Sequence, residues 1–242
     1  MKPQILRTAV ILAGGLGTRL RSEVADVPKP MAPVGGRPFL EHQMQYWMTQ
    51  GIRRFILSVG YKREVIMDHF QRSWNGVAVD YAIEAEPLGT GGGVLLAAAQ
   101  ILRDEPFLLL NGDTFFHLSL SDMFAHYQSA NAALSVALFK ASESGRYGRA
   151  DVASDGRLRL LASEPAQQGE YANGGVYILS RHALALWLSQ PPRKLSFESD
   201  ILPAMLRADQ KLMGFRSDGA FIDIGIPDDW RRASEVIASA QL

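Results

Sequence analysis

The chain has 242 residues, of which 47% are hydrophobic and 21% are charged, so it has enough apolar material for a folded core and is not a disordered chain. The 25 basic and 25 acidic residues cancel, which argues against a nucleic-acid partner and means that a bound anion needs a local cluster of cations. The chain has no cysteine, which excludes disulfides, thiol nucleophiles and cysteine-bound metals.

The first half of the chain alternates strand-like and helix-like segments. Buried strands are predicted by apolar or alternating runs at residues 10–12, 55–59, 77–83 and 107–110. Helical spacing of apolar residues predicts helices over residues 39–50, 63–70 and 94–102. This rhythm is typical of a mainly parallel sheet that is covered by helices on both faces.

The second half of the chain has a different pattern. It predicts strands at residues 134–139, 175–179 and 221–224, a hairpin around the turn at 154–156, and helices near 181–188, near 199–207 and from Pro227 onward. We therefore expect one α/β domain over residues 1–242 with three layers, Rossmann-like, in which a mostly parallel central sheet carries an inserted, smaller antiparallel part. The apolar run at residues 9–13 is too short for a signal peptide or a membrane span, so we expect a soluble, cytoplasmic protein with no membrane partner.

A glycine loop follows the first predicted strand. Gly14, Gly15 and Gly17 lack Cβ atoms, so their backbone amides can approach an anion closely. Arg19 supplies a planar fork for phosphate oxygens, and Lys29 supplies a second cation between two prolines. This combination suits a triphosphate. Neither well-known phosphate loop fits, because the Rossmann pattern needs a small residue where Leu20 stands and the P-loop needs Gly-Lys-Ser/Thr.

Two aspartates lie at the ends of predicted strands. Asp113 follows the run at residues 107–110, and Asp223 ends a short apolar strand. Ligands of open α/β sheets bind beyond the carboxyl ends of the strands. If the two carboxylates converge there, they form a hard oxygen site suited to Mg²⁺.

The glycine loop is part of a longer motif that resembles the signature of the sugar-1-phosphate nucleotidylyltransferases. The motif reads GGLGTRL at residues 14–20 and PKPM at residues 28–31. Within that family the chain is most similar to the bacterial D-glycero-D-manno-heptose 1-phosphate guanylyltransferases, on the segments PLGTGG at 87–92, NGDTFF at 111–116 and FIDIGIP at 221–227. The resemblance runs through nearly the whole chain.

The resemblance implies roles for individual residues. Arg19, Lys29 and Asp113 are the expected catalytic residues, and Asp113 and Asp223 the expected ligands of Mg²⁺. The expected nucleotide-binding residues lie mainly in the first half, residues 1–112: Leu12, Ala13, Gly14, Gly15, Gly17, Thr18, Glu84, Pro87, Gly89, Thr90 and Gly112. The sugar phosphate is expected mainly on the second half, residues 113–242, at Gly148, Glu164 and Asn173. Glu84 accepts hydrogen bonds only, which favours the two donors of guanine.

One departure from the family pattern concerns the sugar phosphate. Many relatives have Glu-Lys-Pro where this chain has Ser163-Glu164-Pro165, so the family's lysine is missing. Arg146, Arg149 or Lys194 replaces it, or the acceptor binds differently.

The expected reaction moves a nucleoside monophosphate from an NTP, with GTP favoured, to a sugar 1-phosphate, with heptose 1-phosphate favoured, and releases pyrophosphate. Three alternatives stay open: a hexose-1-phosphate uridylyl-, thymidylyl- or cytidylyltransferase, a catalytically silent sugar-nucleotide sensor, and a dinucleotide-dependent oxidoreductase. Relatives form dimers or tetramers, so a homo-oligomer is one option.

Overall fold

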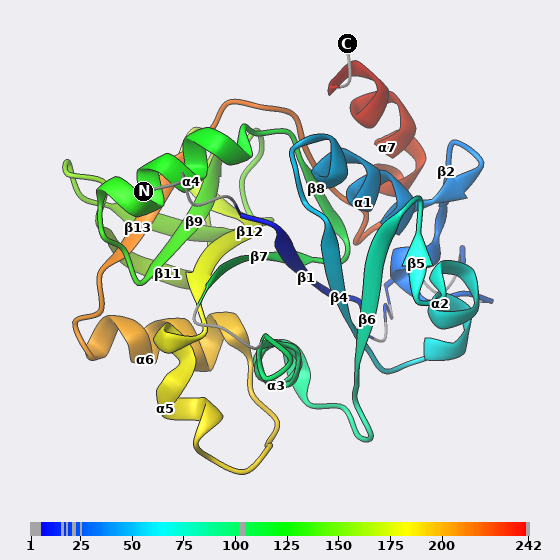
Figure 1. Cartoon of the computed structure of the whole chain (residues 1–242). Coiled ribbons are helices and arrows are strands. Elements are labelled where there is room, and N and C mark those ends of the chain that lie inside the picture. The colour runs from blue at the N-terminus through cyan, green and yellow to red at the C-terminus, as the bar shows by residue number, and fades with distance from the viewer. Residues whose placement is uncertain are drawn as a thin grey trace.

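A computed structural model describes residues 6–15, 17, 19–20, 23–24, 26–101 and 105–240. Within these residues, ten strands form one sheet in the order β11-β10-β12-β7-β1-β4-β6-β5, to which β9 and β13 are joined through β12 (Figure 1). The first half of the chain contributes parallel strands, namely β1 (Thr8–Leu12), β4 (Arg54–Val59), β6 (Val77–Ile83) and β7 (Pro106–Asn111), and the antiparallel edge strand β5 (Ser73–Trp74).

The second half of the chain extends the same sheet with mostly antiparallel pairs. Its strands are β9 (Leu134–Lys140), β10 (Gly148–Val152), β11 (Leu158–Pro165), β12 (Tyr171–Ser180) and β13 (Leu212–Arg216). Strand β12 is antiparallel to both β7 and β9, and β10 and β11 form the predicted hairpin. The predicted fold, a mostly parallel sheet with an added antiparallel part, is therefore confirmed.

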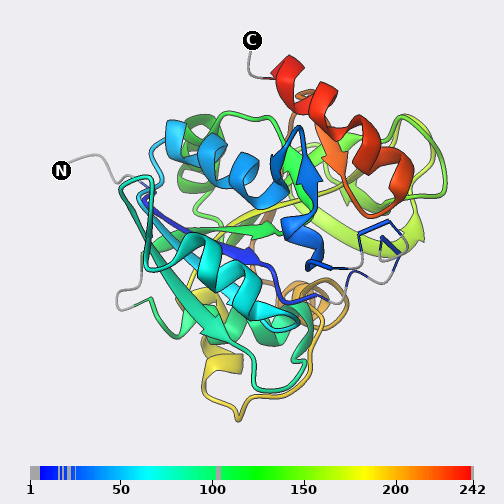
Figure 2. The same ribbon diagram turned by 90° about the vertical axis from the view of Figure 1, so that its right-hand side faces the viewer.

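Helices cover both faces of the sheet (Figures 1 and 2). One face carries α1 (Phe39–Thr49), α2 (Arg63–Phe70), α4 (Leu120–Ser129) and α7 (Pro227–Ala240), and the other carries α3 (Gly89–Ala98), α5 (Ala185–Leu188) and α6 (Leu202–Arg207). Because side chains alternate across a strand, β1 sends Ala9 and Ile11 into one core and Val10 into the other. No described helix is both long enough and apolar enough to cross a bilayer.

Two short antiparallel pairs stand outside the large sheet. Strand β8 (Thr114–Phe116) pairs with β14 (Phe221–Asp223), and β2 (Pro33–Val34) pairs with β3 (Arg37–Pro38). The β8–β14 pair joins segments that are far apart in sequence, and it begins directly after Asp113 and ends at Asp223. Single turns complete the described elements: η1 (Lys29–Met31), η2 (His182–Leu184) and η3 (Phe197–Ile201).

The third helix differs from its prediction. We predicted residues 94–102, but α3 begins at Gly89 and ends at Ala98, and residue 102 lies outside the described residues. The glycine run is its first turn, because the Leu195 carbonyl accepts a hydrogen bond from the Gly91 amide at 2.8 Å and packs where a side chain at Gly89 would stand. Helix α4 was not predicted, although Ser119 caps it by accepting from the Asp122 amide at 3.2 Å.

A buried histidine in α1 makes stability depend on pH. His42 is 8% exposed, and its ring nitrogens lie 2.9 Å from the Val34 carbonyl oxygen and 3.2 Å from Arg37 Nη2. Arg37 can only donate, so Nδ1 is the acceptor and the ring is neutral. Burial is the main cause that lowers the pKa of His42 below its usual value of 6.5.

We therefore expect the native protein to lose stability as the pH falls below about 6.5, because the unfolded chain then binds a proton that native His42 does not. The slope from His42 is at most about 1.4 kcal/mol per pH unit. Urea unfolding of the wild type and of His42→Asn between pH 5 and 7.5 measures this slope. The variant should have the shallower one, and equal slopes in the two proteins would contradict the assignment.

Candidate active site

A cleft opens at the carboxyl end of the parallel strands, where the glycine loop leaves β1. It has a volume of about 270 Å³ and is lined by Leu12, Gly15, Gly17, Arg19, Lys29, Pro30, Thr90, Asn111, Gly112, Asp113 and Gly225. Eight of these eleven residues are among the predicted site residues; Pro30, Asn111 and Gly225 are not. All three stand within the quoted motifs, and this position in the sequence is the feature that could have predicted them as site residues. Thr18 lies outside the described residues.

The glycine loop fits the site because three of its positions have no Cβ. A Cβ at Gly14 would lie 2.6 Å from Glu84 Oε1, and one at Gly17, whose φ is +57°, would lie 2.8 Å from the Cβ of Lys29. No heavy atom lies within 4 Å of a Cβ at Gly15, which faces the open cleft. Gly14 and Gly17 therefore allow close packing, and Gly15 leaves room for a ligand.

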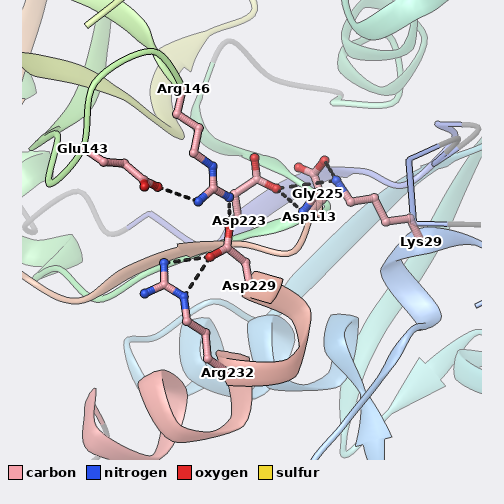
Figure 3. Close-up of polar contacts among 8 residues, drawn as sticks. All are labelled: Lys29, Asp113, Glu143, Arg146, Asp223, Gly225, Asp229 and Arg232. Atoms are coloured by element: carbon pink, nitrogen blue, oxygen red, sulfur yellow. Dashed lines mark hydrogen bonds and ion pairs between the residues drawn. The ribbon is translucent and has the colours of Figure 1, made fainter. Parts of the chain in front are cut away.

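Three charged groups meet at the centre of the cleft. Lys29 Nζ lies 2.6 Å from Asp113 Oδ2 and 3.5 Å from Asp223 Oδ1 (Figure 3). The side chain of Lys29 is 10% exposed, and it is the first residue of η1, where the flanking prolines restrict the backbone. Sequence reasoning expected these residues in one site, and the structure brings them together.

Backbone contacts fix the two carboxylates. Asp223 pairs with Thr114 in the β8–β14 ladder, and the Ile224 amide donates to the Asp113 carbonyl oxygen at 2.9 Å. Burial, followed by the nearby Asp113 carboxylate, raises the pKa of Asp223; Lys29, the Gly225 amide and Arg19 oppose this rise. The two carboxylates therefore repel each other, and a cation between them lowers this repulsion.

The two carboxylates fit a divalent cation that brings its own further ligands. Lys29 Nζ already demonstrates that a positive charge is accepted between Asp113 and Asp223. Among the described residues, no group of three or more His, Asp or Glu side chains could hold a metal. Mg²⁺ is commonly bound by one or two carboxylates together with substrate phosphates and waters, and this donor set matches that requirement.

The segment that was expected to contact the base has an internal structural role. Glu84 follows β6, and its carboxylate accepts hydrogen bonds from Ser58 Oγ at 3.2 Å and from the Leu88 amide at 2.9 Å. A Cβ at Gly93 would lie 3.2 Å from the same carboxylate. Glu84 thus joins the glycine loop, β4 and the start of α3. Pro87 and Gly89 are exposed beside it, and Thr90 is the residue of this segment that lines the cleft.

The residues expected at the sugar phosphate lie on three neighbouring strands. Gly148 on β10 pairs with Pro165 on β11, next to the exposed Glu164. Asn173 on β12 donates from Nδ2 to the Tyr177 hydroxyl at 2.6 Å and accepts from the Gly175 amide at 3.0 Å. None of the three lines the cleft itself.

Sequence reasoning missed Glu198, which connects the two sides of the site. Thr90 Oγ1 donates to Glu198 Oε2 at 2.9 Å, and the buried Tyr177 hydroxyl donates to Glu198 Oε1 at 3.4 Å. The carboxylate therefore links the start of α3 to Asn173 through Tyr177. No motif around Glu198 gave a signal for this contact.

Comparison with known proteins assigns the class of enzyme. Residues 8–240 match the nucleotidyl transferase family, and the chain belongs to this family. It is 41% identical over 227 residues to the D-glycero-alpha-D-manno-heptose 1-phosphate guanylyltransferase of Aneurinibacillus thermoaerophilus, covering 94% of this chain and 96% of the relative. It is 31% identical to the UTP–glucose-1-phosphate uridylyltransferase AglF of Haloferax volcanii, covering 94% and 95%.

A similar structure has also been solved. HddC from Yersinia pseudotuberculosis has a TM-score of 0.83 and 37% sequence identity, and the match covers 95% of this chain and 99% of that one. The crystal structure of HddC in complex with GMP-PN gives the same values. The predicted membership of the nucleotidyltransferase family is thus confirmed.

Proposed function

We propose that this enzyme transfers GMP from GTP to a heptose 1-phosphate, giving a GDP-heptose and pyrophosphate. The identity to a heptose 1-phosphate guanylyltransferase over 94% of the chain carries the proposal. The likeness to HddC, which has been solved with a guanine nucleotide analogue, supports the choice of base. A neutral overall charge, with the two cations Arg19 and Lys29 lining the cleft, suits small anionic substrates.

The transfer needs no covalent protein intermediate. A phosphate oxygen of the sugar 1-phosphate attacks the α-phosphorus of GTP and forms a new P–O bond. The bond from the α-phosphorus to the oxygen that bridges to the β-phosphate breaks, and its electron pair leaves with pyrophosphate. Repulsion between the anions is the main obstacle, so fixed charges and correct positioning supply the catalysis.

The charged residues of the cleft have distinct roles in this proposal. Lys29, held between Asp113 and Asp223, contacts the α-phosphate and the incoming phosphate. Arg19 lies on the exposed loop and neutralises the departing pyrophosphate. Asp113 and Asp223 would hold Mg²⁺, and the bound cation would screen the charge of the reacting phosphates. The amides of the glycine loop contact the triphosphate.

A pyrophosphate-exchange panel tests the substrates. Labelled pyrophosphate should enter GTP only when the corresponding GDP-sugar is present, and in the forward direction GTP with heptose 1-phosphate should react fastest among four NTPs and several sugar 1-phosphates. The identity to AglF makes UTP with glucose 1-phosphate the second candidate. Faster turnover with UTP would replace the proposed base, and no turnover with any pair would favour a sensor.

Removal of metal is a second test. We expect turnover to vanish in EDTA and to return with Mg²⁺, and we expect calorimetry to detect Mg²⁺ binding in the wild type that Asp113→Asn and Asp223→Asn lack. Full activity in the chelator would contradict a role for the metal.

A further inference from the structure

A chain of ion pairs lies at the start of α7, beside the charged centre of the cleft (Figure 3). Asp229 is 2% exposed, yet its carboxylate pairs with two arginines: Arg146, from the segment before β10, and Arg232, whose Nη2 lies 2.7 Å from Oδ1. Arg146 also reaches outward, and its Nη1 lies 2.8 Å from Glu143 Oε1. The mechanism described above uses none of these four groups.

The two partners of Arg146 differ in how firmly they hold it. The side chain of Asp229 is 3% exposed, so separating it from its cations would leave a charge buried without compensation. The side chain of Glu143 is 53% exposed and lies in a loop, so water can replace its contact easily. Arg146 is thus fixed on one side and exchangeable on the other.

Tyr147 connects Arg146 to the strand that carries Asp223. The Cζ atom of Arg146 lies 5.1 Å from the centre of the Tyr147 ring, and that ring lies 5.4 Å from the ring of Phe221 on β14, the strand that ends at Asp223. Asp229 stands in the first turn of α7, a few residues after Asp223 and Gly225. An acceptor that approaches the α-phosphorus has a dianionic phosphate, and a cation in addition to Lys29 lowers its repulsion by the phosphates of GTP.

Resting on the proposed function, we propose that Arg146 binds the phosphate of the acceptor, that Asp229 holds Arg146 in place, and that Glu143 occupies the phosphate position until the acceptor exchanges for it. A guanidinium presents paired donors that match phosphate oxygens as well as carboxylate oxygens. The N–H groups that Glu143 releases are therefore the ones that the acceptor uses.

The other two candidate cations fit this role less well. Lys194 is exposed and stands beside Leu195, whose amide donates to the Leu88 carbonyl, so it belongs to the segment that covers α3. Arg149 makes no ion pair with a carboxylate of the described residues, and its Nε is buried without a hydrogen-bond partner. Of the three, Arg146 is the one that a buried carboxylate, that of Asp229, holds in place.

Four substitutions test the proposal, because it predicts that two raise the KM for the acceptor, one lowers it and one leaves it unchanged. Arg146→Met should raise the KM for sugar 1-phosphate by about thirty-fold or more, and Asp229→Asn by about ten-fold, with GTP affinity within about two-fold of wild type. Glu143→Gln should lower the acceptor KM by about two- to five-fold, because it removes the competing carboxylate. Asp228→Asn, the exposed neighbour of Asp229, is the matched control and should change neither constant.

Calorimetric titration of sugar 1-phosphate into protein loaded with a non-hydrolysable GTP analogue gives the same comparison without turnover. The proposal is overturned if Glu143→Gln weakens acceptor binding as Asp229→Asn does. It is also overturned if the affinity for GTP falls together with the affinity for the acceptor, because either result indicates an ion pair with a purely structural role. An unchanged acceptor KM in Arg146→Met would also overturn the proposal. If Arg146→Met does not fold, Arg146→Lys, which loses the paired donors, must still raise the acceptor KM. Lack of turnover in the wild type with every acceptor would instead contradict the proposed function.

Discussion

Asp223→Asn and Asp113→Asn should each lower kcat by about a thousand-fold or more while the protein stays folded. Asparagine keeps the size of the side chain and removes the charge that binds a divalent cation. The substitution also relieves the repulsion that raises the pKa of Asp223, so little stability should be lost. Lys29 keeps one carboxylate partner in each variant, because it contacts both in the wild type.

Three measurements test this expectation: pyrophosphate release, Mg²⁺ binding by calorimetry, and thermal unfolding. Asp218→Asn is a suitable control, because Asp218 is an exposed aspartate on the segment that leads into β14 and does not line the cleft. Its kcat should equal that of the wild type. Rates within ten-fold of wild type in both Asp113→Asn and Asp223→Asn would show that the acidic pair does not carry the chemistry.

The sequence predicted those parts of the fold whose signal is local. The apolar runs gave β4, β6 and β7 to within a residue or two, and the periodicity over residues 63–70 gave α2. The helix that starts at Pro227 was predicted from a proline followed by two acidic residues. These signals lie within a few residues of the element that they specify, so no knowledge of the rest of the chain was needed.

Features that depend on distant contacts were not predictable in the same way. The start of α3 depends on the carbonyl of Leu195, which is remote in sequence, and the glycines gave no sign of that partner. Strand β8 has three residues, too few for a periodicity, and exists because β14 pairs with it. Asp229 is buried and pairs with Arg146 and Arg232, whereas its neighbour Asp228 is exposed. A sequence pattern cannot tell which of the two adjacent aspartates is buried.

The candidate site was predictable only in part for a related reason. Motifs identified Arg19, Lys29, Asp113 and Asp223 as a set, because Arg19 belongs to the glycine loop, Lys29 lies between two prolines in the second part of the same motif, and the two aspartates stand at strand ends. Their roles stay predictions. Motifs did not tell which glycines face a ligand and which face protein: a Cβ at Gly91 would lie 3.0 Å from the Leu195 carbonyl oxygen, whereas one at Gly15 would meet nothing.

Gly225→Ala should lower kcat by about a hundred-fold with almost no loss of stability, since displacing catalytic groups by about 1 Å has effects of this size. Three charged groups surround the missing side chain. A Cβ at Gly225 would lie 2.8 Å from Asp223 Oδ1, 3.2 Å from Lys29 Nζ and 3.4 Å from Arg19 Nη2. The Gly225 amide also donates to Asp223 Oδ1 at 2.6 Å, so the methyl group would push against the oxygen that this amide holds.

Gly36→Ala is the contrasting control for this prediction. Gly36 has a φ of +81° and open space around it, in the turn between β2 and β3. Alanine there should cost about 1 kcal/mol of unfolding free energy through backbone strain and leave kcat unchanged. Gly225→Ala should therefore lose rate and keep its stability, whereas Gly36→Ala should lose stability and keep its rate. If Gly225→Ala retained the wild-type kcat, the charged groups around it could move apart freely, and the rigid arrangement of Lys29, Asp223 and Arg19 would not be what the reaction requires.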